Sequence, residues 1–333
     1  MKILVSVILL FGSIYLVASG NSLLLLFVLS LVIVMTVHEA GHAYFMLKHG
    51  IEIKEFGIGI GPIGKQLFYM NARQVHLPLL KINIPPVAFH PLLIGAYVVP
   101  TEEGEEHLKN LPLRSRVQIF GGGVHANLIL AVAIYILLHA WMVILIINNG
   151  MTFPAEVARN AGISAILAFA LLKWHKALSV WSPVAMGMFM AGLLWTLFST
   201  PGATDALIGP IGIVTTGVNI SSSGSPSAAF ELAVYVFAIS LSLGLFNSLP
   251  IPPLDGGHMA TALMKRVKVP QKVISAYGIA GLGLFVAFVA FILWNDFQML
   301  GALGTVLFML CLALVSLVVI RSMRKRLIEK RSA

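Results

Sequence analysis

Cysteine and charge are the two features that this sequence has least of. Cys311 is the only cysteine among 333 residues, so the chain contains no intrachain disulfide and no thiolate metal site. Charged residues make up 11% of the chain and hydrophobic residues 58%, whereas about a quarter of a soluble domain is charged. This composition predicts an integral membrane protein. The long apolar runs predict transmembrane helices and exclude a β-barrel.

The apolar runs predict a polytopic α-helical membrane protein with about six transmembrane helices. These helices are expected over residues 3–19, 22–47, 117–147, 229–249, 276–294 and 299–320. Lysine and arginine gather between the runs and in the tail, which is typical of cytoplasmic loops. The formal net charge of +9 is therefore attributed to membrane topology and not to nucleic-acid binding. We expect a multi-pass protein in the lipid bilayer with both termini in the cytoplasm.

Residues 48–116 are the longest section without a transmembrane pattern, and their basic residues mark them as cytoplasmic. Residues 56–62 and 74–79 alternate like short strands broken by glycine and proline. We predict a β-hairpin region over about 51–100 that lies at the membrane. The four glutamates between 102 and 106 are expected to form a solvated acidic turn.

Residues 148–228 are predicted to be external or re-entrant. They hold two apolar pieces, 161–172 and 177–199, separated by a Lys-Trp-His-Lys sequence. The sequence leaves open whether these pieces cross the membrane as a hairpin or lie along its outer face. Both alternatives leave the later helices in the same orientation, because two crossings return the chain to the side from which it started.

The run over 22–47 contains the sequence His38-Glu39-Ala40-Gly41-His42. On a helix, two histidines four residues apart lie on one face. Two such imidazoles can bind one zinc ion, and Glu39 can act as general base for the water that zinc activates. The alternative is a pair of core histidines beside a buried glutamate. Ionisable side chains at membrane depth are costly and mark functional sites, so a shared metal ion is the better explanation.

Aspartate is also scarce, and its scarcity points to a third ligand. The chain contains only Asp205, Asp255 and Asp296, and catalytic zinc sites usually take three protein ligands. Asp205 and Asp296 are predicted on the opposite side of the membrane from the histidines, whereas Asp255 follows the inner end of the 229–249 helix. Prolines before it and glycines after it impose irregular backbone, which membrane proteins tolerate only inside protein or beside water. The alternative for Asp255 is a helix-capping or turn residue.

Taken together, these motifs resemble the site-2 protease family of intramembrane zinc metalloproteases, in its prokaryotic form. The segment Asn247–Gly257, of the form N-x-x-P-x-P-x-L-D-G-G, is similar to the motif that carries the family's third ligand. Gly122-Gly123-x-x-x-Asn127 resembles its glycine-rich motif, and residues 95–98 resemble part of its β-hairpin region. Residues 209–212 resemble a segment that precedes the aspartate-bearing helix in bacterial members.

The resemblance covers residues 22–296 and leaves an extra helix over 1–21 and an extra helix with a basic tail over 297–333. Many bacterial members carry a PDZ domain between the third helix and the aspartate helix. Here that interval is mostly apolar and has no room for one. The resemblance implies the prokaryotic cell membrane as the location.

The resemblance implies that His38, His42 and Asp255 bind Zn²⁺ and that Glu39 activates the water. Asn127 and Asn247 would hold the substrate or stabilise the oxyanion; the alternative for both is hydrogen bonding between helices. The implied activity is endoproteolysis of a single-pass transmembrane protein, such as a pre-trimmed anti-sigma factor or similar membrane-tethered regulator. We also hypothesise that the β-rich stretch offers a strand edge to an extended substrate.

Two other functions remain open from the residues alone. The first is a membrane-embedded zinc hydrolase that acts on a small or lipid substrate. The second is a non-enzymatic ion-conducting protein, for which Glu39→Gln would leave function largely intact. The absence of an internal repeat gives an inverted-repeat transporter little support.

Overall fold

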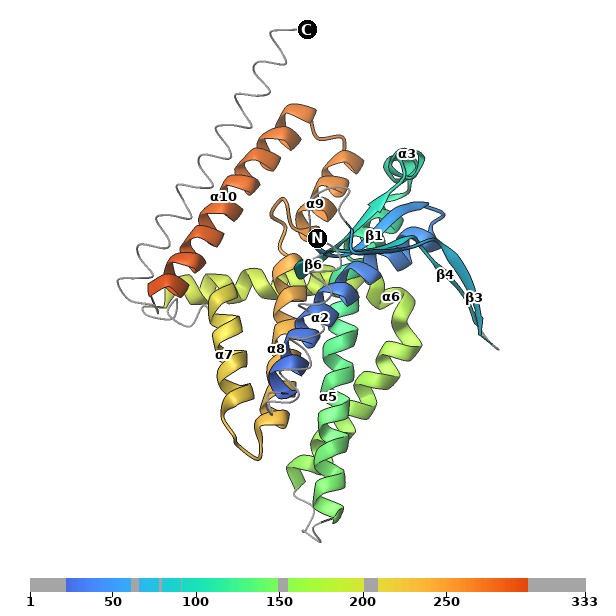
Figure 1. The fold of residues 1–333 in the computed structure, drawn as a ribbon. Coiled ribbons are helices and arrows are strands. Elements are labelled where there is room, and N and C mark those ends of the chain that lie inside the picture. Colours follow the sequence, from blue (N-terminus) through green and yellow to red (C-terminus); the bar gives the residue numbers. More distant parts are fainter. Residues whose placement is uncertain are drawn as a thin grey trace. The chain divides into compact units, whose positions relative to one another are not determined.

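A computed structural model describes residues 22–60, 66–77, 80–90, 92–148, 155–200 and 209–298. Five helices in this part of the chain are long and apolar enough to cross a membrane. They are α2 (Ser22–Lys48), α5 (Gly122–Asn148), the Lys176–Thr196 part of α6, α8 (Ala228–Asn247) and α10 (Gln271–Gln298). The predicted polytopic helical fold is confirmed (Figure 1). The helices predicted over 3–19 and 299–320 lie outside the described residues.

The chain divides into two compact units, one of residues 1–194 and 217–282, the other of residues 195–216 and 283–333. Helices α2, α5 and α8 pack against one another in the first unit. Near the end of α2, Gly41 meets Gly122 at the start of α5, so these two helices run in opposite directions. A Cβ atom on Gly41 would lie 2.2 Å from the carbonyl oxygen of Gly122. Backbone contact of this kind is how small residues hold membrane helices together.

The β region contains six strands, and its predicted presence is confirmed. They are β1 (Ile53–Ile60), β2 (Phe68–Met70), β3 (Arg73–Leu77), β4 (Leu80–Ile84), β5 (Val87–Phe89) and β6 (Leu92–Pro100). A four-stranded sheet has the order β2-β5-β1-β6, and β3 and β4 form a separate hairpin. Strand β1 pairs parallel with β5 and antiparallel with β6. Phe56 and Val87 on one sheet face join a buried core with Phe45, Met46 and Ile119.

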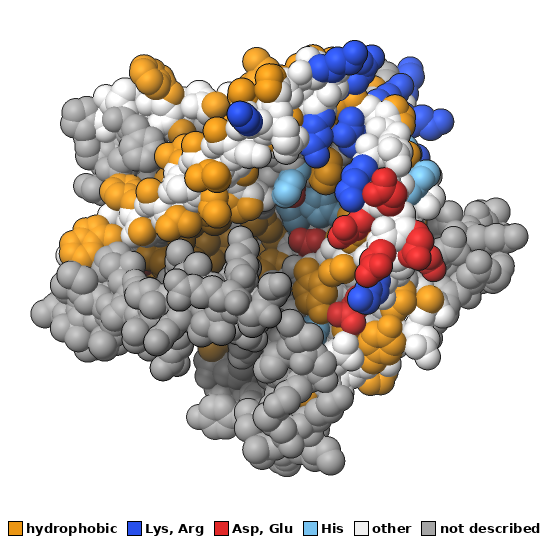
Figure 2. All heavy atoms as spheres, turned by 90° about the horizontal axis from the view of Figure 1, so that it is seen from above, with side chains coloured by type: hydrophobic (Ala, Val, Ile, Leu, Met, Phe, Trp, Pro, Cys, Tyr) orange, Lys and Arg blue, Asp and Glu red, His pale blue; other side chains and the backbone are white. Residues whose placement is uncertain are grey.

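The predicted acidic turn is wrong, because residues Glu102–Asn110 form helix α3. Thr101 caps this helix by accepting the Gly104 N–H on its hydroxyl oxygen at 3.1 Å. Glutamates in the first turn are favourable because they face the positive end of the helix dipole. Figure 2 shows acidic side chains gathered on one face of the molecule, with basic side chains beside them.

The predicted helix over 117–147 is interrupted near its start. Helix α4 (Leu113–Phe120) ends at Gly121, and α5 begins at the next residue. A Cβ atom on Gly121 would lie 2.6 Å from the ring of Pro183 in α6. This break lets α4 pack against α9 (Asp255–Arg266) while α5 packs against α2 and α8.

Residues Ala155–Ser199 form one helix, α6, which continues through the polar sequence that we expected to separate two pieces. Figure 1 shows α6 running beside α5 and then bending away from it. Gln118 of α4 donates to Ser179 Oγ at 2.7 Å, and His125 Nδ1 and Ser182 Oγ are hydrogen-bonded at 3.0 Å. The second half of α6 therefore lies at the same end of α5 as the α2–α5 contact. How this segment lies relative to the membrane stays a prediction.

In the second unit, Asp296 is fully buried near the end of α10. Its carboxylate accepts the backbone N–H of Gly209 at 2.9 Å and that of Ile211 at 2.8 Å. These N–H groups lie at the start of α7 (Pro210–Ser222), where an acidic group satisfies unpaired donors. Asp296 therefore lies within α10. Its side of the membrane stays a prediction, and Asp205 lies outside the described residues.

Candidate metal centre

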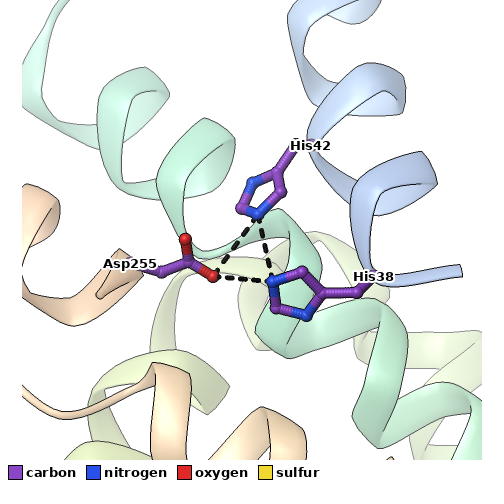
Figure 3. Close-up of side chains that lie close together, drawn as sticks. All are labelled: His38, His42 and Asp255. Atoms are coloured by element: carbon purple, nitrogen blue, oxygen red, sulfur yellow. Dashed lines mark hydrogen bonds and ion pairs between the residues drawn. The ribbon is translucent and has the colours of Figure 1, made fainter. Parts of the chain in front are cut away.

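The structure brings His38, His42 and Asp255 together (Figure 3). The two histidines lie on α2, and Asp255 is the first residue of α9. Asp255 Oδ2 is 3.1 Å from His38 Nε2 and 3.3 Å from His42 Nε2, and the two ring nitrogens are 3.4 Å apart. These are the only three described residues whose His, Cys, Asp or Glu side chains form such a group.

The size of this triangle matches one face of a tetrahedral zinc site. With zinc–ligand bonds of 2.0–2.1 Å, neighbouring ligand atoms in a tetrahedron are about 3.3 Å apart. Three protein ligands on one face leave the fourth corner for water or substrate, which is the arrangement of catalytic zinc sites. The geometry therefore fits a catalytic zinc ion.

The hydrogen bonds around the triangle give a second reason for a cation. His42 Nδ1 donates to the carbonyl oxygen of Ile119 at 2.7 Å, which leaves Nε2 of the neutral ring as a lone-pair acceptor. That lone pair faces the carboxylate oxygen of Asp255. Among the described residues, Asp255 Oδ2 is one of the buried atoms without a hydrogen-bond partner. Acceptors that face each other in a buried site repel unless a cation or a proton lies between them.

Glycine residues make room for the triangle. Gly123 on α5 lies against both histidines, and a Cβ atom there would be 2.5 Å from His38 Nε2 and 2.5 Å from His42 Nε2. Any side chain at this position would therefore occupy the space of the ligand atoms. This contact gives the glycine-rich motif a physical role that its sequence alone did not show.

Replacement of Gly123 by alanine is expected to lower zinc affinity on the order of 10- to 100-fold, the size of effect seen when supporting contacts of a metal ligand are lost. The added methyl group must displace one or both imidazoles. Zinc titration of the purified variant measures the effect. Gly162→Ala on α6 is the matched control, because its Cβ would meet nothing within 4 Å. Equal zinc affinity of Gly123→Ala and the wild type would contradict the geometry.

A tight turn carries Asp255 to the histidines. Helix α8 ends at Asn247, and Leu254 is extended immediately before α9 begins. A Cβ atom on Gly256 would lie 2.2 Å from the carbonyl oxygens of both Ser248 and Leu249. The chain therefore folds back onto its own backbone between the two helices, and this requires glycine directly after the aspartate.

Glu39 lies beside the triangle, half-buried on α2. Its carboxylate interacts with the backbone N–H of Val98 in β6. One turn earlier on α2, Met35 Sδ accepts the N–H of Gly95 at 3.1 Å. The edge of β6 therefore runs along the face of α2 that carries Glu39. Strand β1 is internal to the sheet, so β6 and β2 are the edges that could receive another strand.

The two asparagines singled out by their motifs lie in different surroundings. Asn127 is fully buried on α5, and within the described residues neither its Nδ2 nor its Oδ1 has a hydrogen-bond partner. Asn247 is half-buried at the end of α8, and its Nδ2 donates to the carbonyl oxygen of Leu243 at 3.0 Å. Their roles toward substrate stay predictions.

Sequence reasoning missed several polar contacts near the triangle. The Ile119 carbonyl that orients His42 has no sequence signal, because it is a backbone atom from a separate helix. His258, three residues after Asp255, stacks on Phe120 with ring centroids 5.4 Å apart. His90 is buried and hydrogen-bonded to Tyr97. The pairing of β1 with β6 brings the Glu55 and Tyr97 side chains to the same face of the sheet. The sequence does not reveal the register of this pairing, so it could not show that the two side chains meet.

Comparison with known proteins identifies the family. The sequence profile of peptidase family M50 matches residues 26–290. The chain therefore belongs to peptidase family M50, the family of site-2 proteases that its motifs resemble.

Two relatives illustrate the similarity. One is CPE1693 of Clostridium perfringens, named as a candidate zinc metalloprotease, which is 22% identical over 325 residues. That match covers 78% of this chain and 94% of the relative. The other is metalloprotease MmpA of Caulobacter vibrioides, which is 36% identical over 120 residues, or 30% of each chain.

Proposed function

We propose that this protein is an intramembrane zinc endopeptidase. The observation that carries the proposal is the triangle of His38, His42 and Asp255, with Glu39 beside it, among helices apolar enough to cross a membrane. The family membership and the names of the relatives, which are metalloproteases, support it. The inferred ion is Zn²⁺, because two imidazoles and one carboxylate are ligands that zinc commonly takes in catalytic sites.

Each residue has a defined role in this reaction. His38, His42 and Asp255 would hold the zinc ion, and the Ile119 carbonyl fixes the ring of His42. Zinc, when bound, supplies the Lewis acidity that polarises the substrate carbonyl and makes water nucleophilic at neutral pH. Glu39 takes a proton from the attacking water and returns it to the leaving amine, so that one peptide bond and one water give an acid and an amine. Asn127 would donate to the developing oxyanion.

The substrate class follows from the surroundings of the site. A segment that reaches it enters among apolar helices, so we infer a single-pass transmembrane protein as substrate. The peptide amides of a helical segment are paired and shielded, and cleavage therefore requires local unwinding. By family likeness, the substrates would be membrane-tethered regulators, such as an anti-sigma factor already trimmed outside the membrane.

We further propose the prokaryotic cell membrane as the location, with both termini in the cytoplasm. Basic side chains gather on the face seen in Figure 2, and those of α9 and the loop after it include Lys265, Arg266 and Lys268. An excess of lysine and arginine marks the cytoplasmic side of a membrane protein. The metal triangle includes the first residue of α9 and would therefore lie in the cytoplasmic half of the bilayer.

The proposal is tested with the purified protein in lipid vesicles that also contain a fusion protein with one transmembrane segment. We expect a new cleavage product within or beside that segment. The product should disappear after zinc is removed with a chelator and return when zinc is added back. Cleavage that a chelator leaves unchanged would contradict the zinc mechanism. Lipid hydrolysis or ion flux without any cleavage would favour one of the two other functions instead.

A further inference from the structure

A partly buried polar network lies on the sheet beside the metal centre. The Tyr97 hydroxyl donates to Glu55 Oε1 at 2.5 Å and is 2.7 Å from His90 Nε2. The second carboxylate oxygen of Glu55 accepts from Gln66 Nε2 at 3.0 Å. His90 is 4% exposed, and its backbone N–H donates to the carbonyl oxygen of Ile58 at 2.9 Å. The network therefore ties β6 to β1 and to the residue that follows β5.

The direction of the hydrogen bonds in this network is fixed. Tyr97 has one hydroxyl proton and donates it to Glu55, so His90 Nε2 must donate to the hydroxyl oxygen. Burial and the hydrogen bond to Glu55 raise the pKa of Tyr97 to about 12. Tyr97 therefore keeps its proton throughout the physiological pH range. Titration of Tyr97 does not change the network within that range.

The sequence of β1 is adapted to the ring of Tyr97. Gly57 lies directly opposite Tyr97 in the antiparallel pair of β1 and β6. A Cβ atom on Gly57 would lie 2.2 Å from the ring. The ring can therefore cross the backbone of β1 and reach Glu55, two residues before Gly57. A larger residue at this position would remove the contact between Tyr97 and Glu55.

Strand β6 connects this network to Glu39, the proposed general base. Tyr97 and Val98 are neighbours, and side chains of consecutive strand residues point to opposite faces. The Tyr97 side chain is held by Glu55 and His90, while the Val98 N–H meets the Glu39 carboxylate. A shift of β6 along β1 would carry the Val98 N–H away from Glu39. The position of the Val98 N–H, which donates to Glu39, thus depends on Tyr97.

We propose that Tyr97 is a positioning residue for Glu39. Clamped between Glu55 and His90, Tyr97 fixes β6 against β1, and the Val98 N–H then orients the Glu39 carboxylate toward the attacking water. The inference rests on the proposed endopeptidase function, and it assigns to the β region a role in the chemical step. A role of the same strand in binding substrate gives a different kinetic result and can be separated from it.

The test compares cleavage by the full-length protein in lipid vesicles, using the single-pass fusion protein as substrate. Tyr97→Phe keeps the ring on Gly57 and removes both hydrogen bonds. We expect kcat to fall about tenfold, the effect of one hydrogen bond to a charged group, with KM and zinc content unchanged. Tyr69→Phe, at an exposed tyrosine on β2 of the same sheet, is the matched control and should behave as wild type.

Variants of Glu55 keep the test decisive if Tyr97→Phe folds poorly. Glu55→Ala should lower kcat as Tyr97→Phe does, and Glu55→Gln should restore most of the loss because its amide oxygen still accepts from Tyr97. The double variant Tyr97→Phe with Glu55→Ala should be no slower than either single variant, because the two substitutions break the same series of contacts.

The outcomes are distinct. A wild-type kcat in both Tyr97→Phe and Glu55→Ala would overturn the inference. A raised KM with unchanged kcat would also overturn it and would assign β6 to substrate binding. Failure of the wild type to cleave any single-pass substrate would instead reject the proposed function itself.

Discussion

Glu39→Gln is expected to lower the rate of substrate cleavage about a thousandfold while zinc content stays at the wild-type level. General acid–base groups contribute roughly 10²- to 10⁴-fold to enzymatic rates. Glutamine has nearly the same shape as glutamate and can still accept the Val98 N–H, but it cannot take a proton from water. The variant therefore removes the proton transfer and leaves the three candidate ligands of the ion untouched.

Cleavage of the single-pass fusion protein and zinc analysis of the same preparation measure this result. Glu103→Gln on α3 is the matched control, because the same change is made at an exposed glutamate outside the metal centre. Cleavage by Glu39→Gln at the wild-type rate would show that Glu39 is not the base. It would also revive the ion-conducting alternative, which requires no proton transfer to a peptide.

Asp255→Ala is expected to reduce bound zinc from one ion per chain to a trace and to abolish cleavage. The two histidines that remain offer too few ligands for a tightly held catalytic ion. The apparent binding free energy of structural zinc sites is about 10–16 kcal/mol and is shared among the ligands. Removal of one ligand therefore lowers the affinity for zinc by roughly two orders of magnitude or more. The expected loss of metal distinguishes this variant from Glu39→Gln.

Asp296→Ala is the control for Asp255→Ala. Both aspartates carry a mostly buried carboxylate, but Asp296 accepts backbone N–H groups of Gly209 and Ile211 and is not part of the metal triangle. Asp296→Ala should therefore keep one zinc ion per chain. If zinc stayed bound to Asp255→Ala, or was lost equally from both variants, the assignment of Asp255 as third ligand would be wrong.

The sequence predicted the residues of the metal triangle because their signals are local. His38 and His42 share a helix face by spacing alone, and Asp255 is one of only three aspartates. The sequence could not predict the distances between α2 and α9, which depend on a backbone contact between Gly41 and Gly122 and on the turn at Gly256. Whether these residues act as ligands stays a prediction for the zinc measurements above.

The errors in the fold come from features that local patterns do not determine. Four glutamates in five residues were expected to form a turn, yet the Thr101 cap and the dipole favour a helix. The polar sequence over 173–176 does not end α6, because it contains no proline or glycine. The pairing of β1 with β5 is parallel and joins residues about 30 apart, so no hairpin signal could have shown it. The network of Tyr97 depends on the register of β1 with β6, which is also non-local.

The wide separation of the three candidate ligands along the chain has a consequence for biosynthesis. Asp255 follows His42 by more than 200 residues, which at about 5–20 residues per second is roughly 10–40 seconds of translation. Throughout that interval the nascent chain already carries both histidines and Glu39, but it lacks the carboxylate that completes the triangle. Under the proposed function, an unfinished or prematurely terminated chain would therefore have no protease activity. Insertion and docking of α8 and α9 would then be the step that completes the metal centre and allows the proposed protease activity to begin.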